Sequence, residues 1–256
     1  MGSSKSIQTS RAIAGYWGES RRPLVSLAFV APILVVYEGG LLWLGPKAMR
    51  NGADVWLRQW LEWMGFGQYF LLPILTCSIL LAWHHLNCDR WRFGWSVLYG
   101  MFVECILLGL LLLATALLQG ALLASLSMGD GATVADSPTS GRVVAFLGAG
   151  IYEELLFRLM LLPAVAAMLR VGGMKRNARL FIAVLATSLL FAAAHYRLDI
   201  ALGPIQWATS CGEPFEWISF AFRFLAGSFF SVLFLYRGFG VAAGTHALYD
   251  ILVYSL

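Results

Sequence analysis

Two glutamates and an arginine stand close together in a segment that is otherwise almost entirely apolar. Glu153 and Glu154 are adjacent, and Arg158 follows Glu154 by four residues. On a helix this spacing puts Glu154 and Arg158 on one face in the favourable order, so the two charges can neutralise each other. Glu153 is rotated by about 100° and needs another partner, a cavity or its own proton. A carboxylate so placed suits general-base catalysis, although a purely structural Glu–Arg clamp would use the same residues.

A second group of polar residues lies near the end of the chain. His246 and Asp250 are four residues apart, so a helix puts the imidazole and the carboxylate on one face. Such a pair can bind a metal, hold a water molecule or form a hydrogen bond that fixes the tautomer of the histidine. Gly240 and Gly244 precede it and would allow close approach to another helix. His195 follows three alanines, which give another thin helix face.

Long apolar runs must carry these residues. The chain has 256 residues, of which 59% are apolar and 12% charged, and its mean hydropathy is +0.73. A hydrocarbon core of roughly 30 Å takes about 20 helical residues to cross. The sequence therefore predicts an all-α polytopic transmembrane bundle of about seven or eight spans. The candidate runs are Leu24 to Leu44, Tyr69 to His85, Trp95 to Leu126, Val143 to Leu169, Leu180 to His195, Trp217 to Tyr236 and Val241 to Leu256.

The remaining features predict one membrane domain and its orientation. Val55 to Met64 alternates tryptophans with charged residues, which is typical of an interfacial helix. We expect residues 1–23 to form a cytoplasmic segment and residues 24–256 to form a single transmembrane domain. The net charge of +4 is best explained by membrane topology, because the loops on the N-terminal side carry most of the Lys and Arg. Nucleic-acid binding is not indicated, and the lipid bilayer is the expected surrounding.

Depth along the helices favours one common site. At 1.5 Å per residue, Glu153, His246 and Asp250 lie at similar distances from the external ends of their spans, and His195 is near the same end. Residues from three antiparallel helices could therefore converge at one level. An ionisable side chain in the membrane costs roughly 2.5–3.5 kcal/mol on insertion scales, so each one needs a partner or a function.

Other ionisable residues in the apolar runs are interpreted as structural. Glu38 precedes a glycine pair and is expected near a helix end. Glu104 and Arg223 could neutralise one another or bind water. Nothing in their spacing indicates catalysis.

Three motifs in order on successive C-terminal helices resemble the type II CAAX prenyl protease family, also called the CPBP or Abi family of intramembrane proteases. The resemblance covers roughly Val143 to Leu256, and nothing before residue 140 takes part in it. Each motif alone is weak, and the three together are specific. They are Glu153-Glu154-xxx-Arg158, Phe191-xxx-His195 and His246-xxx-Asp250.

The resemblance implies a role for each of these residues. The first glutamate of the pair, Glu153, would activate a water molecule, with Glu154 and Arg158 in support. His195, His246 and Asp250 would bind the water, a metal ion or the oxyanion.

Asp250 departs from the pattern of the prenyl-protein proteases, which have asparagine there. Asparagine can donate a hydrogen bond to an oxyanion, whereas an ionised aspartate would repel it and favour a metal. Two mechanisms therefore stay open. In one, Glu153 is the general base and no metal is needed. In the other, His195, His246 and one carboxylate, from Glu153 or Asp250, bind a zinc ion, and the other acid is the base.

The leading hypothesis is an intramembrane endopeptidase that hydrolyses a peptide bond of a membrane-anchored or lipidated protein. A proton-coupled transporter would also need ionisable residues inside the membrane, although no inverted repeat is evident. A non-catalytic membrane scaffold or immunity protein is the third possibility. The predicted partner is a peptide or protein substrate in the membrane.

Overall fold

The computed structural model describes residues 15–45, 48–67, 70–124, 139–197, 199–202, 205–208 and 212–255. Three ends of the predicted apolar runs lie outside these residues, namely Tyr69, Leu126 and Leu256. Most of the predicted cytoplasmic segment 1–23 lies outside them as well. The chain forms two compact units, which are described separately. The first comprises Met1–Glu154 and Phe234–Leu256, and the second comprises Leu155–Leu233.

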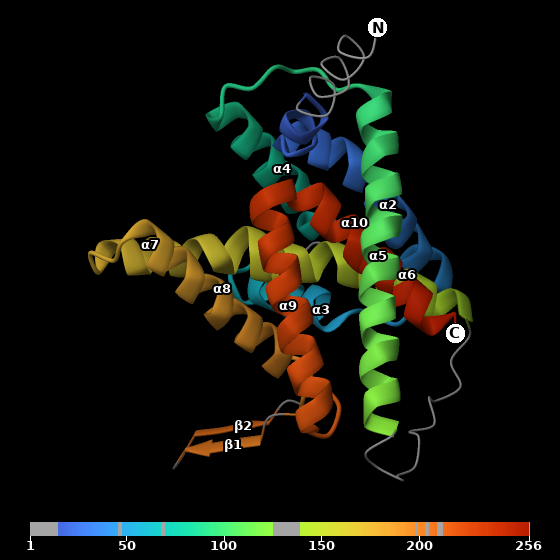
Figure 1. The fold of residues 1–256 in the computed structure, drawn as a ribbon, viewed down its shortest axis with the longest axis vertical. Coiled ribbons are helices and arrows are strands. Elements are labelled where there is room, and N and C mark those ends of the chain that lie inside the picture. Colours follow the sequence, from blue (N-terminus) through green and yellow to red (C-terminus); the bar gives the residue numbers. More distant parts are fainter. Residues whose placement is uncertain are drawn as a thin grey trace, which may run out of the picture. The chain divides into compact units, whose positions relative to one another are not determined.

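The first unit is a bundle built around its C-terminal helix (Figure 1). That helix, α10, packs against α2, α5 and α6, and its first nine residues are all buried. The amphipathic α3 lies against α6, and α4 lies against α2. The helices are α2 (Pro23–Leu44), α3 (Gly52–Trp63), α4 (Leu71–Leu86), α5 (Trp95–Ala124), α6 (Thr139–Glu154) and α10 (Phe239–Tyr254).

Glycines set the spacing between the helices of this bundle. A Cβ on Gly240 would lie 2.8 Å from Met101 Cε, and a Cβ on Gly244 would lie 2.9 Å from Cys105 Sγ. Both values are well below van der Waals contact, which begins at about 3.5 Å. The close approach predicted for this glycine pair is therefore confirmed, and α10 packs deep in the bundle for that reason.

The second unit contains helices and one hairpin. Helix α8 (Arg176–Ala193) packs against α7 (Leu162–Val171) and the π-helix η2 (Leu155–Leu161). Strands β1 (Asp199–Leu202) and β2 (Ile205–Ala208) pair antiparallel with Asp199 opposite Ala208. Helix α9 (Trp217–Arg237) begins in this unit and ends in the first.

Each predicted apolar run corresponds to helix in the structure, and the interfacial helix over residues 55–64 corresponds to α3. The helical bundle is therefore confirmed. Two local features were not predicted. One is the β1–β2 hairpin, and the other is η2, which divides the predicted run Val143 to Leu169 into α6, η2 and α7. Single-turn π segments inside helices occur frequently at functional sites, and this one begins directly after Glu154.

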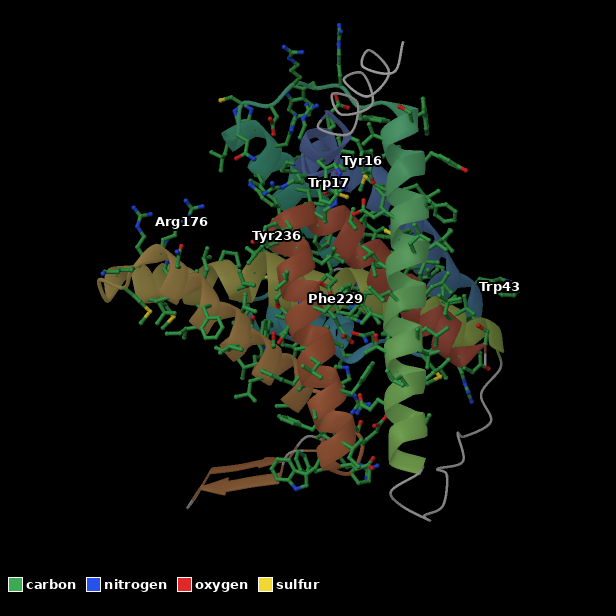
Figure 2. The ribbon with its side chains drawn as sticks, in the orientation of Figure 1. Tyr16, Trp17, Trp43, Arg176, Phe229 and Tyr236 are labelled. Carbon is green, nitrogen blue, oxygen red and sulfur yellow. The ribbon has the colours of Figure 1, made fainter. Side chains whose placement is uncertain are left out.

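The surface of the helices suits a bilayer. Within the part of the chain that the structure describes, α2, α5, α8 and α9 are long and apolar enough to cross a membrane, and α4 is apolar but shorter. Large apolar side chains are exposed on these helices, such as Trp43 on α2, which is 80% exposed and points outward in Figure 2. In water so much exposed hydrocarbon would cause association, whereas lipid covers it at no cost.

Candidate active site

The centre of the site is a hydrogen bond between two buried residues on adjacent helices. Glu154 is the last residue of α6 and is fully buried, and His246 lies in the middle of α10 with 4% of its surface exposed. Glu154 Oε1 and His246 Nδ1 are 2.7 Å apart. An ionised carboxylate only accepts, so Nδ1 carries the proton and donates. This bond fixes the orientation of the ring and directs Nε2 to the opposite side.

Two further carboxylates lie on the Nε2 side of His246. Glu153 Oε2 and Asp250 Oδ2 are each 3.7 Å from Nε2. This distance is longer than a direct hydrogen bond, and at such separations a water molecule can bridge the two groups. The structure therefore groups three carboxylates, those of Glu153, Glu154 and Asp250, around the imidazole of His246 within the first unit.

Gly150 explains why α6 and α10 approach so closely at this point. A Cβ on Gly150 would lie 2.6 Å from Ala247 Cβ and 2.7 Å from Ala243 O. Gly150 is one turn before Glu154, and Ala247 follows His246. The missing side chain thus lets the backbones of the two helices come near enough for a direct bond between Glu154 and His246.

Glu153 has a partner that the sequence did not indicate. Asn51 Nδ2 donates a hydrogen bond to Glu153 Oε1 over 2.6 Å. Asn51 is the N-cap of α3, where its Oδ1 accepts from the backbone N–H of Ala53. The capping role is readable from the sequence, because asparagine followed by an amphipathic run is a helix-start signal. The contact with Glu153 is not, since 102 residues separate the two.

A buried network of charges holds α3 beside this site. Arg58 bonds Asp54 at 2.7 Å and Glu38 at 3.0 Å, while Tyr152, the neighbour of Glu153, donates to Glu38 at 2.6 Å. Tyr37 donates to the fully buried Asp54. Burial alone would lower the pKa of Arg58, but Asp54 and then Glu38 raise it above its usual value. Glu38 of α2 thus accepts hydrogen bonds from Arg58 of α3 and Tyr152 of α6, which agrees with the structural role predicted for it.

Arg158 and His195 belong to the second unit, where both contact Phe191. The guanidinium of the fully buried Arg158 lies 4.3 Å from the centre of the Phe191 ring and donates to Gly227 O at 3.1 Å. His195 Nδ1 is 2.8 Å from Phe191 O, and its ring packs edge-on against the Phe191 ring. A carbonyl only accepts, so Nδ1 carries the proton and Nε2 is the acceptor atom of the neutral ring.

The expected pairing of Glu104 with Arg223 is wrong. Glu104 pairs with Arg237 at 2.6 Å, and Arg223 pairs with Glu213 at 2.7 Å. Arg237 is 14 residues after Arg223 on α9, which is roughly 21 Å along the helix axis. Arg223 and Arg237 lie on the same apolar helix, so hydropathy alone could not show which of them is the partner of Glu104.

Among the described residues, no set of three or more His, Cys, Asp or Glu side chains is placed to hold a metal ion. One reason is that Nδ1 of His246 faces Glu154 rather than the other carboxylates. Zinc binding at these residues stays a prediction.

The fold and the site define a class of protein: a polytopic membrane protein with a buried carboxylate–histidine centre in its bundle. Residues 136–252 match the model of a protein family, the Rce1-like type II CAAX prenyl endopeptidases. This C-terminal segment is similar to that family, and the resemblance seen in the motifs is confirmed. All six predicted site residues lie inside the matched segment, whereas α2 to α5 lie outside it. No curated protein and no solved structure matches the chain.

Proposed function

We propose that this protein is an intramembrane endopeptidase that cleaves lipid-modified substrates with a glutamate-activated water molecule. The observation that carries the proposal is the position of Glu153 and Glu154 on opposite nitrogens of the buried His246. One carboxylate orients the ring, and the other is placed to act on a water molecule beside it. Glu153, Glu154 and His246 are buried, which strengthens the electrostatic interactions between them.

In this scheme Glu153 is the general base. It removes a proton from water while the water oxygen attacks the carbonyl carbon of the scissile peptide bond. The resulting tetrahedral intermediate collapses when Glu153 returns that proton to the leaving amine, so atoms and charge balance. His246 is protonated on both nitrogens, with Nδ1 donating to Glu154 and Nε2 donating to the oxyanion.

Asp250 has a role in this scheme that asparagine would not have. Its carboxylate is 3.7 Å from Nε2 of His246 and on the same helix. A negative charge at this distance stabilises the imidazolium that donates to the oxyanion. The roles of Arg158 and His195 rest on the family resemblance. The bond from His195 Nδ1 to Phe191 O supports water binding, because it leaves Nε2 as the acceptor atom.

An apolar groove in the first unit favours the proposal that the substrate is lipid-modified. Its volume is about 900 Å³, and α2, α5, α6 and α10 line it. Ala247 and Ile251 of α10 form part of the wall, and each directly follows a site residue, His246 or Asp250. We propose that this groove holds the lipid chain of the substrate. Binding the chain there would place the adjacent peptide beside the polar centre.

The proposal is tested with the full chain purified in detergent and a quenched-fluorescence peptide that carries a prenyl group and a CAAX-type C-terminus. We expect cleavage by the parent protein and its loss in Glu153→Gln, whose amide cannot accept the proton from water. Each sample is divided between a chelator and added zinc. Loss of cleavage in chelator would contradict the metal-free mechanism. Equal cleavage by the parent and Glu153→Gln would overturn the proposal.

A further inference from the structure

Asn51 holds two groups at once with its side-chain amide. Oδ1 accepts the backbone N–H of Ala53 at 2.8 Å, and Nδ2 donates to Glu153 Oε1 at 2.6 Å. Only the oxygen can accept from an N–H, and only the nitrogen can donate to a carboxylate. The two bonds therefore define one orientation of the amide. Each bond also holds the side chain in place for the other.

The backbone around Asn51 is firmly anchored. Asp54, one turn into α3, is fully buried and bonds Arg58 and Tyr37. Arg58 in turn bonds Glu38, which accepts from Tyr152 next to Glu153. The start of α3 and the end of α6 are thus tied together by buried, charge-assisted bonds, which are the stronger kind. The network keeps the backbone at Asn51 close to Glu153.

We propose that Asn51 is a positioning residue for the general base. The inference rests on the proposed function of Glu153. The terminal torsion of a glutamate is soft, so an unheld carboxylate samples a broad range of orientations. The Asn51 amide binds Oε1 and thereby directs Oε2 to the side of His246 Nε2, 3.7 Å away. The start of α3 adds a positive partial charge that favours a carboxylate there.

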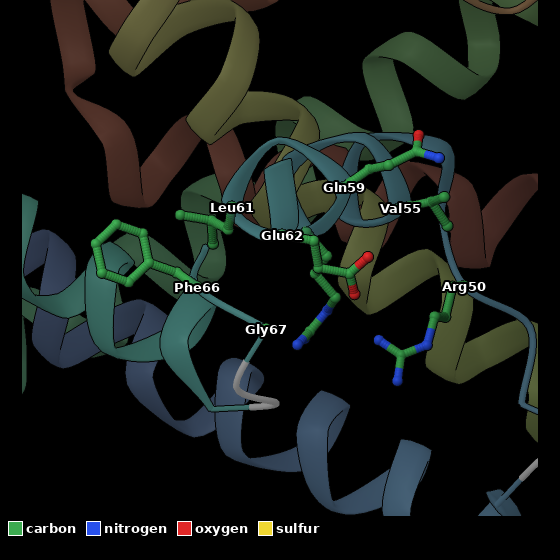
Figure 3. Close-up of a pocket in the computed structure, with 8 residues that line it drawn as sticks. Arg50, Val55, Gln59, Leu61, Glu62, Phe66 and Gly67 are labelled. Carbon is green, nitrogen blue, oxygen red and sulfur yellow. The ribbon is translucent and has the colours of Figure 1, made fainter. Parts of the chain in front are cut away.

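This assignment gives α3 a part in the reaction although it lies outside the family match. The helix also lines a pocket of about 330 Å³ with both charged and apolar walls (Figure 3). Gln59 lines that pocket, is exposed, and lies two turns along the helix from Asn51. It offers a matched control, because it carries the same amide group on the same helix.

The test uses variants that keep the cap but lose the donor. Asn51→Asp and Asn51→Ser both cap helices well. An ionised aspartate cannot donate, and the serine hydroxyl is too short to reach Glu153 while it caps. We expect kcat for the prenylated peptide to fall by up to about 100-fold in both, because a small misplacement of a reacting group can cost that much in rate. In Asn51→Ser, KM and the thermal unfolding midpoint should stay near the parent values.

The controls separate this inference from its alternatives. Gln59→Glu makes the same amide-to-carboxylate change as Asn51→Asp and should keep the parent kcat. If Asn51→Asp and Asn51→Ser keep the parent kcat while Glu153→Gln is inactive, Asn51 is only a cap and the inference is overturned. If Glu153→Gln itself is fully active, the proposed function fails, and this inference fails with it. A fall in kcat in proportion to a loss of folded protein would also overturn it.

Discussion

Gly150→Ala tests whether close packing of α6 on α10 creates the site. The variant adds one methyl group where the Cβ would lie 2.6 Å from Ala247 Cβ and 2.7 Å from Ala243 O. Ordinary contact is about 3.5–4.0 Å, so the helices must separate by about 1 Å. Added to the 2.7 Å between Glu154 Oε1 and His246 Nδ1, this separation puts the pair beyond hydrogen-bond distance.

The expected loss of activity follows from that displacement. A misplacement of about 1 Å in a catalytic group can cost about 100-fold in rate. Overpacking of a core also costs about 1–3 kcal/mol, so the thermal unfolding midpoint should fall. The assay is the initial rate of prenylated-peptide cleavage at saturating substrate, corrected for the folded fraction by size-exclusion chromatography.

The control is Gly39→Ala on α2, where an added Cβ would meet nothing within 4 Å. It should keep the parent rate, and its stability should rise slightly because alanine favours helix by about 1 kcal/mol over glycine. The reasoning is refuted if Gly150→Ala has the rate and stability of the parent. It is also refuted if both glycine variants lose activity equally.

Further predictions concern the charges, the groove and the topology. Glu154→Gln keeps the shape of the side chain but replaces a charged hydrogen bond by a neutral one, which differs by about 1–1.5 kcal/mol, so kcat should fall about 5- to 13-fold; an unchanged steady-state rate would contradict the role of Glu154. Ala28→Phe fills part of the apolar groove and should raise KM for the prenylated peptide but not for its unprenylated form, whereas an equal rise for both would contradict lipid binding there. Arg58→Met leaves Asp54 and Glu38 without their shared cation and should destabilise the protein by about 3–5 kcal/mol in thermal or denaturant unfolding, with a parent-like midpoint as the contrary result. A reporter fused at Lys175 should be active on the cytoplasmic side, and an external signal there would reverse the predicted orientation.

The sequence was sufficient for the helices and for the motifs that carry the family resemblance. The apolar runs predict α2, α5, α8 and α9 because the cost of exposing polar groups to lipid depends mainly on local composition. The pairs at four-residue spacing are also local, since one turn of helix determines which side chains share a face. The family match agrees with these motifs.

The partners of these residues were decided by the tertiary structure. No periodicity relates Asn51 to Glu153 or Arg237 to Glu104, and these contacts join segments more than 100 residues apart. Hydropathy identifies which side chains must be satisfied in the membrane but contains no information about which helix satisfies them. That choice depends on how closely backbones can approach. At α6 and α10 the approach depends on Gly150, whose missing Cβ allows Glu154 to reach His246.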